Sequence, residues 1–171
     1  MKFELLLSEK EISEKVKEIA EEVTRSLRNE KVVIVGVLKG ALFFMADLLR
    51  ELKFSFVYDF IQVKSYEGMQ TTGSIKVLKE PNCDISGKTV LIVEDILDTG
   101  LTLSFIRDYF IEKGAKKVYV CALLDKKKKR LKEIKADFVG FEIDDQFVVG
   151  YGLDCDEKMR ELKDIFILKQ C

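Results

Sequence analysis

The sequence contains no histidine, and its four cysteines never stand in C-x-x-C spacing. Because protein zinc sites are built mainly from histidine and closely spaced cysteine, this composition argues against one. We expect the cysteines to be reduced thiols of a cytoplasmic protein. The N-terminus lacks a signal-peptide pattern, and no apolar run approaches the roughly 18 residues of a membrane span, so we expect no membrane partner.

An excess of either charge is also missing, since 29 Lys and Arg residues balance 30 Asp and Glu residues. The net charge of -1 gives the chain as a whole no electrostatic attraction to nucleic acid. Proline occurs once, and we find neither an internal repeat nor a linker. With 47% apolar residues among 171, the chain can bury a core, and we expect one domain over residues 1–171.

Hydrophobic periodicity predicts alternating strands and helices. Ser8 and Glu11 form a capping-box pattern that opens a helix ending near Asn29. Two further helices are expected at residues 40–53 and 101–113. Strands are expected at residues 31–37, 54–63, 89–93, 118–124, 138–143, 147–149 and 165–168, with 75–78 as a hairpin arm. The polar, glycine-containing stretch 64–73 is expected to be an exposed loop.

This order of strands and helices predicts an α/β protein whose parallel sheet is covered by helices on both faces. The run 31–37 is rich in β-branched residues, which is typical of a strand buried on both faces. In such sheets ligands bind beyond the carboxyl ends of the strands. We therefore look for functional residues just after each strand.

The most informative segment is V-L-I-V-E-D-I-L-D-T-G-L-T at residues 90–102. Glu94 and Asp95 offer acceptor oxygens suited to sugar hydroxyls or to the water shell of a metal. The turn that opens the next helix can cradle a phosphate monoester with its backbone N–H groups, and its glycine permits close approach. The residues of this turn are Thr99, Gly100, Leu101 and Thr102.

A simpler interpretation makes Glu94, Asp95 and Asp98 solvated turn residues, with Asp98 as the helix N-cap. Three carboxylates and a T-G-x-T turn after a buried strand favour the ligand site instead. The segment is not a G-x-x-x-x-G-K-[ST] loop, which argues against an ATPase.

This segment resembles the phosphoribosyl-pyrophosphate motif of type I phosphoribosyltransferases. The rest of the chain resembles the bacterial hypoxanthine-guanine phosphoribosyltransferase family nearly end to end. Four further segments carry that resemblance: Leu38-Lys39-Gly40, Ser65-Tyr66 with Thr71-Thr72-Gly73, Leu123-Leu124-Asp125-Lys126, and residues 137–160. The resemblance implies the type I phosphoribosyltransferase fold, with a central mostly parallel sheet flanked by helices and a small hood formed by N- and C-terminal segments.

The resemblance also implies a reaction in purine salvage. Phosphoribosyl pyrophosphate would donate its phosphoribosyl group to N9 of hypoxanthine or guanine, giving IMP or GMP and pyrophosphate with Mg²⁺ as cofactor. Xanthine remains an alternative base. We expect a cytoplasmic homo-dimer or homo-tetramer that binds no nucleic acid.

Several residues take roles from the resemblance at the sugar and pyrophosphate. Asp98 would act at the purine N7 as general base or acid and would help the 99–102 turn to hold the 5-phosphate. Glu94 and Asp95 would orient the ribose and the metal. Pyrophosphate would be bound by Leu38, Lys39 and Gly40, often with a cis peptide bond between the first two, and by Arg160.

The base side of the site is implied in the same way. Lys126 would donate to the exocyclic oxygen of the purine, Phe147 would stack on the ring, and Val148 would offer backbone groups. Asp154 would lie by the purine and hold a Mg²⁺ bound to pyrophosphate. Alternatively, Lys126 is one of four solvated lysines and Phe147 is a core aromatic. Family members often have proline after the matching lysine, whereas this chain has Lys127 and Lys128, which we interpret as solvated.

In the family, the loop that contains Ser65 and Tyr66 is mobile and closes over the reaction centre; a floppy hairpin tip would have the same composition. Two other classes of function stay open. The basic run 126–130 is the one feature that favours a regulatory nucleotide sensor that binds RNA or DNA, and the net charge argues against it. An oligomeric scaffold with a vestigial site is the third.

Overall fold

The structure is a computed structural model that describes residues 2–68 and 71–169, with side chains of residues 66–73 left out of the description. The elements in chain order are β1 (Lys2–Leu7), α1 (Glu9–Leu27), β2 (Val32–Leu38), α2 (Leu42–Glu51), β3 (Phe56–Gly68), β4 (Thr71–Lys79), β5 (Thr89–Leu97), α3 (Leu101–Glu112), β6 (Lys117–Asp125), the short 3-10 turn η1 (Lys127–Lys129), β7 (Phe138–Glu142), β8 (Val148–Val149) and β9 (Ile165–Lys169).

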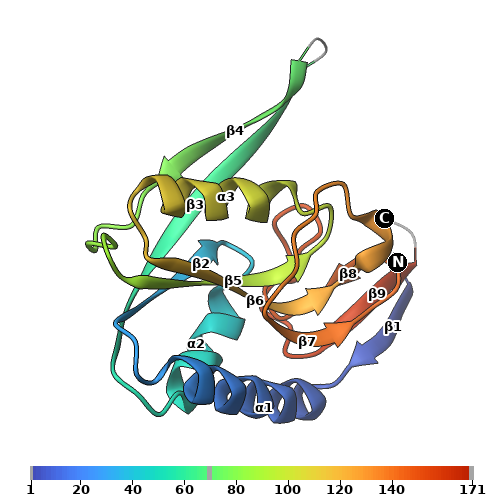
Figure 1. Cartoon of the computed structure of the whole chain (residues 1–171). Coiled ribbons are helices and arrows are strands. Elements are labelled where there is room, and N and C mark those ends of the chain that lie inside the picture. The colour runs from blue at the N-terminus through green and yellow to red at the C-terminus, as the bar shows by residue number, and fades with distance from the viewer. Residues whose placement is uncertain (1, 69–70, 170–171) are drawn as a thin grey trace.

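The main sheet has six strands in the order β4-β3-β2-β5-β6-β7. Its pairs are parallel apart from the antiparallel β3–β4 pair at one edge, which confirms the expected mostly parallel sheet. In Figure 1, α3 covers one face, and α1 and α2 cover the other. Two clusters of buried apolar residues fill the spaces between sheet and helices, one on each face.

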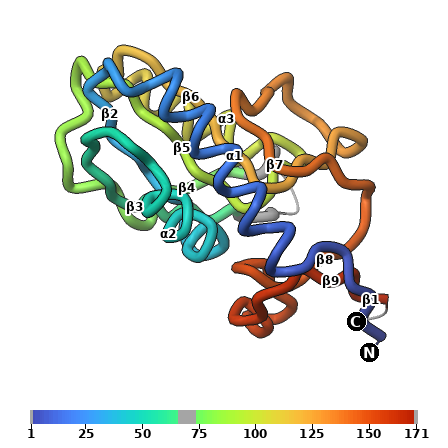
Figure 2. Tube along the Cα trace, turned by 90° about the horizontal axis from the view of Figure 1, so that it is seen from below, coloured from blue at the N-terminus to red at the C-terminus, as the bar shows by residue number. Residues whose placement is uncertain are grey.

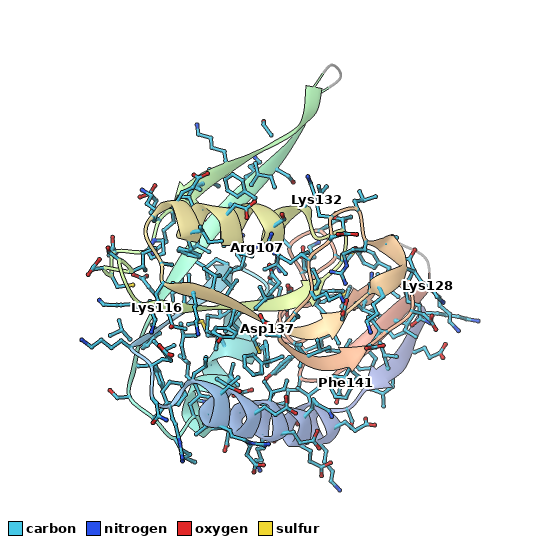
Figure 3. The ribbon with its side chains drawn as sticks, in the orientation of Figure 1. Arg107, Lys116, Lys128, Lys132, Asp137 and Phe141 are labelled. Atoms are coloured by element: carbon cyan, nitrogen blue, oxygen red, sulfur yellow. The ribbon has the colours of Figure 1, made fainter. Side chains whose placement is uncertain are left out.

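Helix α1 forms for the reasons that its sequence suggests. Its capping box is present, with the Ser8 hydroxyl accepting from the Glu11 backbone and the Glu11 carboxylate accepting from the Ser8 backbone. Its buried residues lie on one helical face, which packs beside α2 beneath the sheet (Figure 2). Phe141 of β7 points towards this helix (Figure 3), and the Lys15 Nζ lies 5.6 Å from its ring centroid.

A second, smaller sheet has the strand order β1-β9-β8 and joins the two ends of the chain. Figures 1 and 2 both show the termini side by side at this sheet. It confirms the small hood of N- and C-terminal segments that the resemblance implied. Strand β1 was not predicted, because its outer residues, such as Phe3 and Leu5, are exposed and it is stabilised by pairing with residues at the other end of the chain.

The expectation of an irregular loop at residues 64–73 is wrong. β3 continues to Gly68 and β4 begins at Thr71, with pairs such as Ser65 with Ile75. The two strands form a long ribbon that projects from the body of the protein (Figure 1). Backbone pairing needs no apolar face, so a polar sequence did not reveal it. Ser65 is exposed, while the Tyr66 side chain lies outside the described residues, and the closing motion stays a prediction.

Among the described residues, no helix is both long enough and apolar enough to cross a membrane. Of the cysteines that the structure describes, Cys83, Cys121 and Cys155, none is joined to another by a disulfide.

Candidate functional site at the carboxyl edge of the main sheet

The parallel strands β2, β5, β6 and β7 end at one edge of the main sheet, as the strand order predicts. Residue Leu97 at the end of β5 pairs with Asp125 at the end of β6, which pairs with Glu142 at the end of β7. The Lys126 backbone N–H donates to the Leu97 carbonyl at 2.9 Å. The segments that follow these strands therefore meet, and most of the predicted site residues lie in them.

Glu94 and Asp95 lie in the second half of β5, and each is only 8% exposed. The interpretation of these two as solvated turn residues is therefore wrong. Burial raises the pKa of Glu94 well above its ordinary value, and the neighbouring charge of Asp95 raises it further. Burial also raises the pKa of Asp95, while the Arg160 guanidinium opposes that rise. Two adjacent buried carboxylates favour a cation or hydroxyl donors beside them.

The turn at residues 98–102 opens α3 and lines a cavity of about 200 Å³ together with Glu94 and Asp95. The helix N-cap is Gly100, not Asp98, and it has φ +82° and no capping side chain. Gly100 thus offers no capping side chain, and the Leu101 N–H makes only a long bond of 3.4 Å to the Thr99 hydroxyl. A phosphate can accept from the N–H groups at this helix start. One carboxylate oxygen of Asp98, Oδ1, is buried without a hydrogen-bond partner.

The turn at residues 98–102, the predicted phosphate turn, is held in place by the segment after η1. The Thr99 carbonyl accepts from the Leu131 and Lys132 backbone N–H groups at 2.8 and 3.2 Å. A Cβ on Gly100 would stand 2.7 Å from the Ile134 side chain, so this contact leaves no room for a larger residue. The Arg130 guanidinium forms a buried ion pair with Asp125 at the end of β6. Sequence reasoning missed this pair, although Asp125 stands in one of the segments that resemble the family.

Lys126 differs from the three lysines after it in that its side chain is buried. Lys126 is 6% exposed, so the interpretation of it as a solvated lysine is wrong. Each of the next three side chains is exposed and paired with an acid at the end of β7 or in the loop beyond it. The pairs are Lys127–Glu142, Lys128–Asp144 at 2.5 Å and Lys129–Asp145 at 2.9 Å. These pairs join the loop that carries Lys126 to the loop that leads to Phe147.

Residues 38–40, the predicted pyrophosphate segment, contact both β5 and the turn at residues 150–162, called here the C-terminal turn. The Leu38–Lys39 peptide bond is cis, as the resemblance implied. A Cβ on Gly40 would stand 1.9 Å from the Asp95 Oδ2, and a Cβ on Gly152 would stand 1.9 Å from the Gly40 carbonyl oxygen. The three segments approach so closely that only glycine fits at both positions.

Arg160 lies in the same C-terminal turn. Its Nη1 donates to the Gly152 carbonyl at 2.6 Å, and its Nη2 lies 3.0 Å from Asp154 Oδ1. Its Nε is buried without a partner. The Lys39 Nζ pairs with Glu157 Oε2 at 2.5 Å, which adds a second, exposed link between the pyrophosphate segment and this turn. The structure therefore brings Lys39, Gly40, Asp154 and Arg160 together.

Phe147 lies directly before the short strand β8, and Val148 is the first residue of that strand. Phe147 is 52% exposed, so its interpretation as a core aromatic is wrong and its ring is free to meet a ligand. Val148 is buried and pairs with Ile167 of β9. The Phe147 carbonyl accepts from the Leu168 N–H at 2.9 Å, which fixes the start of the strand.

Comparison with known proteins identifies close relatives. A family described as phosphoribosyl transferase domain matches residues 4–156. A hypoxanthine-guanine phosphoribosyltransferase of Aquifex aeolicus is 48% identical over 171 residues, which is 98% of this chain and 96% of that protein. A hypoxanthine phosphoribosyltransferase of Escherichia coli is 42% identical over 162 residues, 93% of this chain and 91% of that protein.

A similar solved structure is that of a hypoxanthine-guanine phosphoribosyltransferase from Bacillus anthracis, with a HEPES molecule in its active site. The two chains superimpose with a TM-score of 0.92 at 44% identity. The match covers 97% of this chain and 98% of that chain, so the likeness includes the site as well as the sheet.

Replacing Gly152 by alanine tests the close approach at Gly40. The new Cβ would meet the Gly40 carbonyl, and φ is +101°. Gly87→Ala is the matched control, since φ is +68° there with nothing within 4 Å. We expect a loss of about 3 kcal/mol in the free energy of unfolding for Gly152→Ala and about 1 kcal/mol for Gly87→Ala, measured by urea denaturation. Equal losses would show that the approach has room for a side chain.

Proposed function

This chain belongs to the phosphoribosyl transferase family, and from that premise we propose that the carboxyl edge of its main sheet is the active site. The chain is a hypoxanthine-guanine phosphoribosyltransferase of purine salvage, which transfers the phosphoribosyl group of phosphoribosyl pyrophosphate to a 6-oxopurine base. The observation that carries the choice of site is the pair of buried carboxylates Glu94 and Asp95 beside the uncapped N-terminus of α3.

The regulatory alternative has no support. It rested on the basic run at residues 126–130. In the structure, Lys126 is buried, Arg130 is paired with Asp125, and the three lysines between them are paired with acids. A run whose charges are neutralised locally does not form the basic stripe that nucleic acid requires.

The roles that we propose for the residues around the sugar follow from the charges of their side chains and backbone groups. The turn at residues 99–102 holds the 5-phosphate at the start of α3. Glu94 and Asp95 accept from the ribose hydroxyls and favour positive charge that develops on the sugar as its bond to pyrophosphate breaks. Lys39, Gly40 and Arg160 face the departing pyrophosphate, whose negative charge their donors stabilise. Opposite charges thus lie on opposite sides of the breaking bond.

Asp98 is proposed as the proton carrier at the purine N7. It lies between the phosphate turn and the loop that carries Lys126, and its Oδ1 has no partner within the described residues. A carboxylate oxygen in that position can accept the N7 proton as the N9 atom bonds to the sugar. Lys126 donates to the exocyclic oxygen at C6, and the exposed ring of Phe147 stacks on the base.

The residues present fit Mg²⁺, which we propose as the cofactor. Among the described residues no group of three or more potential ligands lies together. Mg²⁺ is commonly held by one or two carboxylates, with waters and substrate phosphates completing its shell. The buried pair Glu94 and Asp95 suits that arrangement, and Asp154 offers a further carboxylate by Arg160. When bound, the ion neutralises charge on the pyrophosphate.

We infer that the enzyme works in the cytoplasm as a homo-dimer or homo-tetramer. Apolar side chains of α2 and β3 line a shallow cavity of about 400 Å³ at the surface. Leu42 and Tyr58 in its lining are 44% and 56% exposed. An apolar surface of this kind is typical of a contact between subunits. The proposed partner is a second copy of the chain.

A panel of bases tests the proposed function. The protein, phosphoribosyl pyrophosphate and Mg²⁺ should form nucleotide with hypoxanthine or guanine but not with adenine, because Lys126 cannot donate to an amino group. Excess chelator should abolish turnover. Nucleotide formation is read by chromatography. Absence of product with every 6-oxopurine would contradict the function, and full activity in chelator would contradict the metal.

Asp98→Asn should retain the fold but lower kcat by roughly 10²–10⁴, since the amide cannot take up a proton. Steady-state kinetics with hypoxanthine measures the change. Asp108→Asn is the control, because Asp108 lies on the exposed side of α3 beside Arg107. An unchanged kcat for Asp98→Asn would remove this residue from proton transfer.

Lys126→Ala should erode the preference for 6-oxopurines over adenine by roughly 10-fold or more, since the loss removes the donor that distinguishes them. The ratio of kcat/KM for hypoxanthine and adenine measures it. Lys128→Ala is the control, because its side chain is 74% exposed and pairs with Asp144. A uniform loss with all bases would contradict the specificity role.

A further inference from the structure

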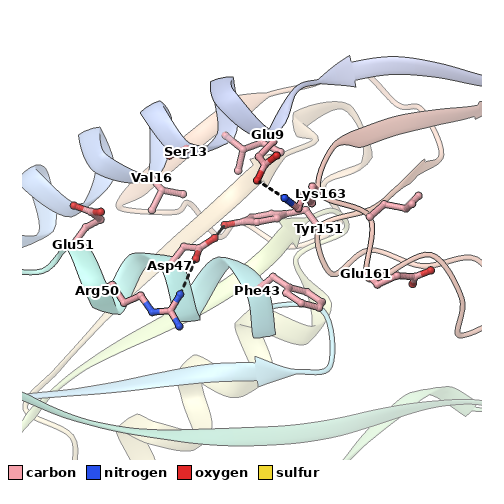
Figure 4. A pocket seen from close by; sticks show the side chains of 12 residues that line it. Glu9, Ser13, Val16, Phe43, Asp47, Arg50, Glu51, Tyr151, Glu161 and Lys163 are labelled. Atoms are coloured by element: carbon pink, nitrogen blue, oxygen red, sulfur yellow. Dashed lines mark hydrogen bonds and ion pairs between the residues drawn. The ribbon is translucent and has the colours of Figure 1, made fainter.

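We propose that the hydrogen bond between Tyr151 and Asp47 is a positioning contact that holds the pyrophosphate end of the active site together. The Tyr151 hydroxyl donates to Asp47 Oδ2 at 2.6 Å, across 104 positions of sequence. Tyr151 lies in the C-terminal turn beside Gly152, and Asp47 lies in α2 (Figure 4). Neither residue is assigned a role above, and the inference rests on the proposed function because the pyrophosphate end is defined by it.

On one side of this contact, the backbone of Tyr151 places Gly152. Tyr151 has φ +50° and is flanked by Gly150 and Gly152, with φ +100° and +101°. Its N–H donates to the Leu162 carbonyl at 2.7 Å, and the Gly152 N–H donates to the Arg160 carbonyl at 2.9 Å. A shift of Tyr151 therefore moves Gly152 and the Arg160 side chain that donates to the Gly152 carbonyl.

On the other side, Asp47 is tied to the pyrophosphate segment through α2. The helix begins at Leu42, directly after that segment, and the Met45 N–H donates to the Ala41 carbonyl at 2.8 Å. Since a hydrogen-bonded helix moves as a unit, a fixed Asp47 fixes the direction from which the chain leaves Gly40. The contacts thus form a closed circuit. It runs from Gly40 through α2 to Asp47, across the hydrogen bond to Tyr151, and from Gly152 back to Gly40.

The hydroxyl is suited to this role because it stays a donor. Tyr151 is 8% exposed, and burial together with the Asp47 carboxylate raises the pKa of its hydroxyl above the ordinary value. The second oxygen of Asp47 faces Arg50, whose Nη1 lies 3.6 Å away. Hydrogen bonds to a charged acceptor are the stronger kind.

Packing alone holds the Tyr151 ring less firmly than packing together with the hydrogen bond to Asp47. Tyr151, Asp47 and Phe43 line a cavity of about 550 Å³ between α1, α2 and the C-terminal turn (Figure 4). The Phe43 ring lies 6.5 Å from the Tyr151 ring, centroid to centroid. Space on this side allows the ring to move once its hydroxyl is no longer held, because an empty space provides no contacts to oppose the shift.

Tyr151→Phe keeps the ring and removes the bond. We expect the KM for phosphoribosyl pyrophosphate and the inhibition constant of inorganic pyrophosphate to rise about 3–10-fold, since both depend on the spacing of Gly40 and Arg160. The KM for hypoxanthine should stay within about twofold, because Lys126 lies on another segment and Phe147 is held by the bonds of its own strand to β9. Steady-state kinetics with Mg²⁺ present measures all three.

The partner residue provides a conservative test. Asp47→Asn retains an oxygen that can accept from the hydroxyl and should stay close to the unmodified enzyme. Asp47→Leu should match Tyr151→Phe, and the double variant should be no worse than either single one, because each removes the same contact. Tyr109→Phe is the matched control, since its hydroxyl is bonded to Glu80 at the far end of α3.

Unchanged constants for phosphoribosyl pyrophosphate and pyrophosphate in Tyr151→Phe would overturn the proposal. An equal rise in the KM of both substrates, with a lower Tm, would assign Tyr151 a general structural role and would overturn it too. Equal effects of Asp47→Asn and Asp47→Leu would show that the acceptor oxygen is irrelevant. Inactivity of the unmodified enzyme in the same assay would instead contradict the proposed function.

Discussion

The architecture of the proposed active site depends on the close contact of three segments at Gly40. Asp95 of β5 lies against one side of this residue and Gly152 of the C-terminal turn against its carbonyl, so that neither glycine can carry a side chain. This approach brings the buried carboxylates of β5 next to the donors of the pyrophosphate segment and Arg160. Elements far from the site therefore affect it as well, because any element that moves one of these three segments changes the distance between the carboxylates and the donors.

The buried acids and the cations of this junction lie on different segments, with Glu94 and Asp95 on β5 and with Lys39 and Arg160 on the other two segments. Glu94 and Asp95 are buried side by side, and their raised pKa values reflect the cost of holding two negative groups away from water. Arg160 and the uncapped start of α3 offer positive potential a short distance away. A substrate with anionic phosphates at both ends and a sugar between them suits that pattern, with each phosphate at a donor group and the sugar at the acids.

Local sequence patterns predicted the elements whose stability is local. The capping box of α1, the buried run of β5 and the turn into α3 were all apparent in short stretches of sequence. The rule that ligands bind beyond the carboxyl ends of parallel strands then predicted Glu94, Asp95 and Lys126 at one edge of the sheet. Sequence reasoning predicted residues 75–78 as a hairpin arm, but it did not find β1, the continuation of the β3–β4 pairing into residues 64–74, or the bond between Tyr151 and Asp47. Each of these depends on a partner that short-range periodicity does not reveal.

The base side of the site shows why both ends of the chain belong to the function. Strand β8 has only two residues, too few to be stable alone, and it carries Val148 next to Phe147. It is held by β9, and β9 is held in turn by β1 through pairs from Lys2 with Lys169 to Leu7 with Ile165. The wall proposed to contact the purine is therefore positioned by the first and last strands of the chain. The ion pairs of Lys127, Lys128 and Lys129 add a link from the segment after Lys126 to the end of β7 and to the loop that leads to Phe147. Exposed pairs contribute little to stability individually, so the paired strands, more than these ion pairs, hold the base side of the site in place.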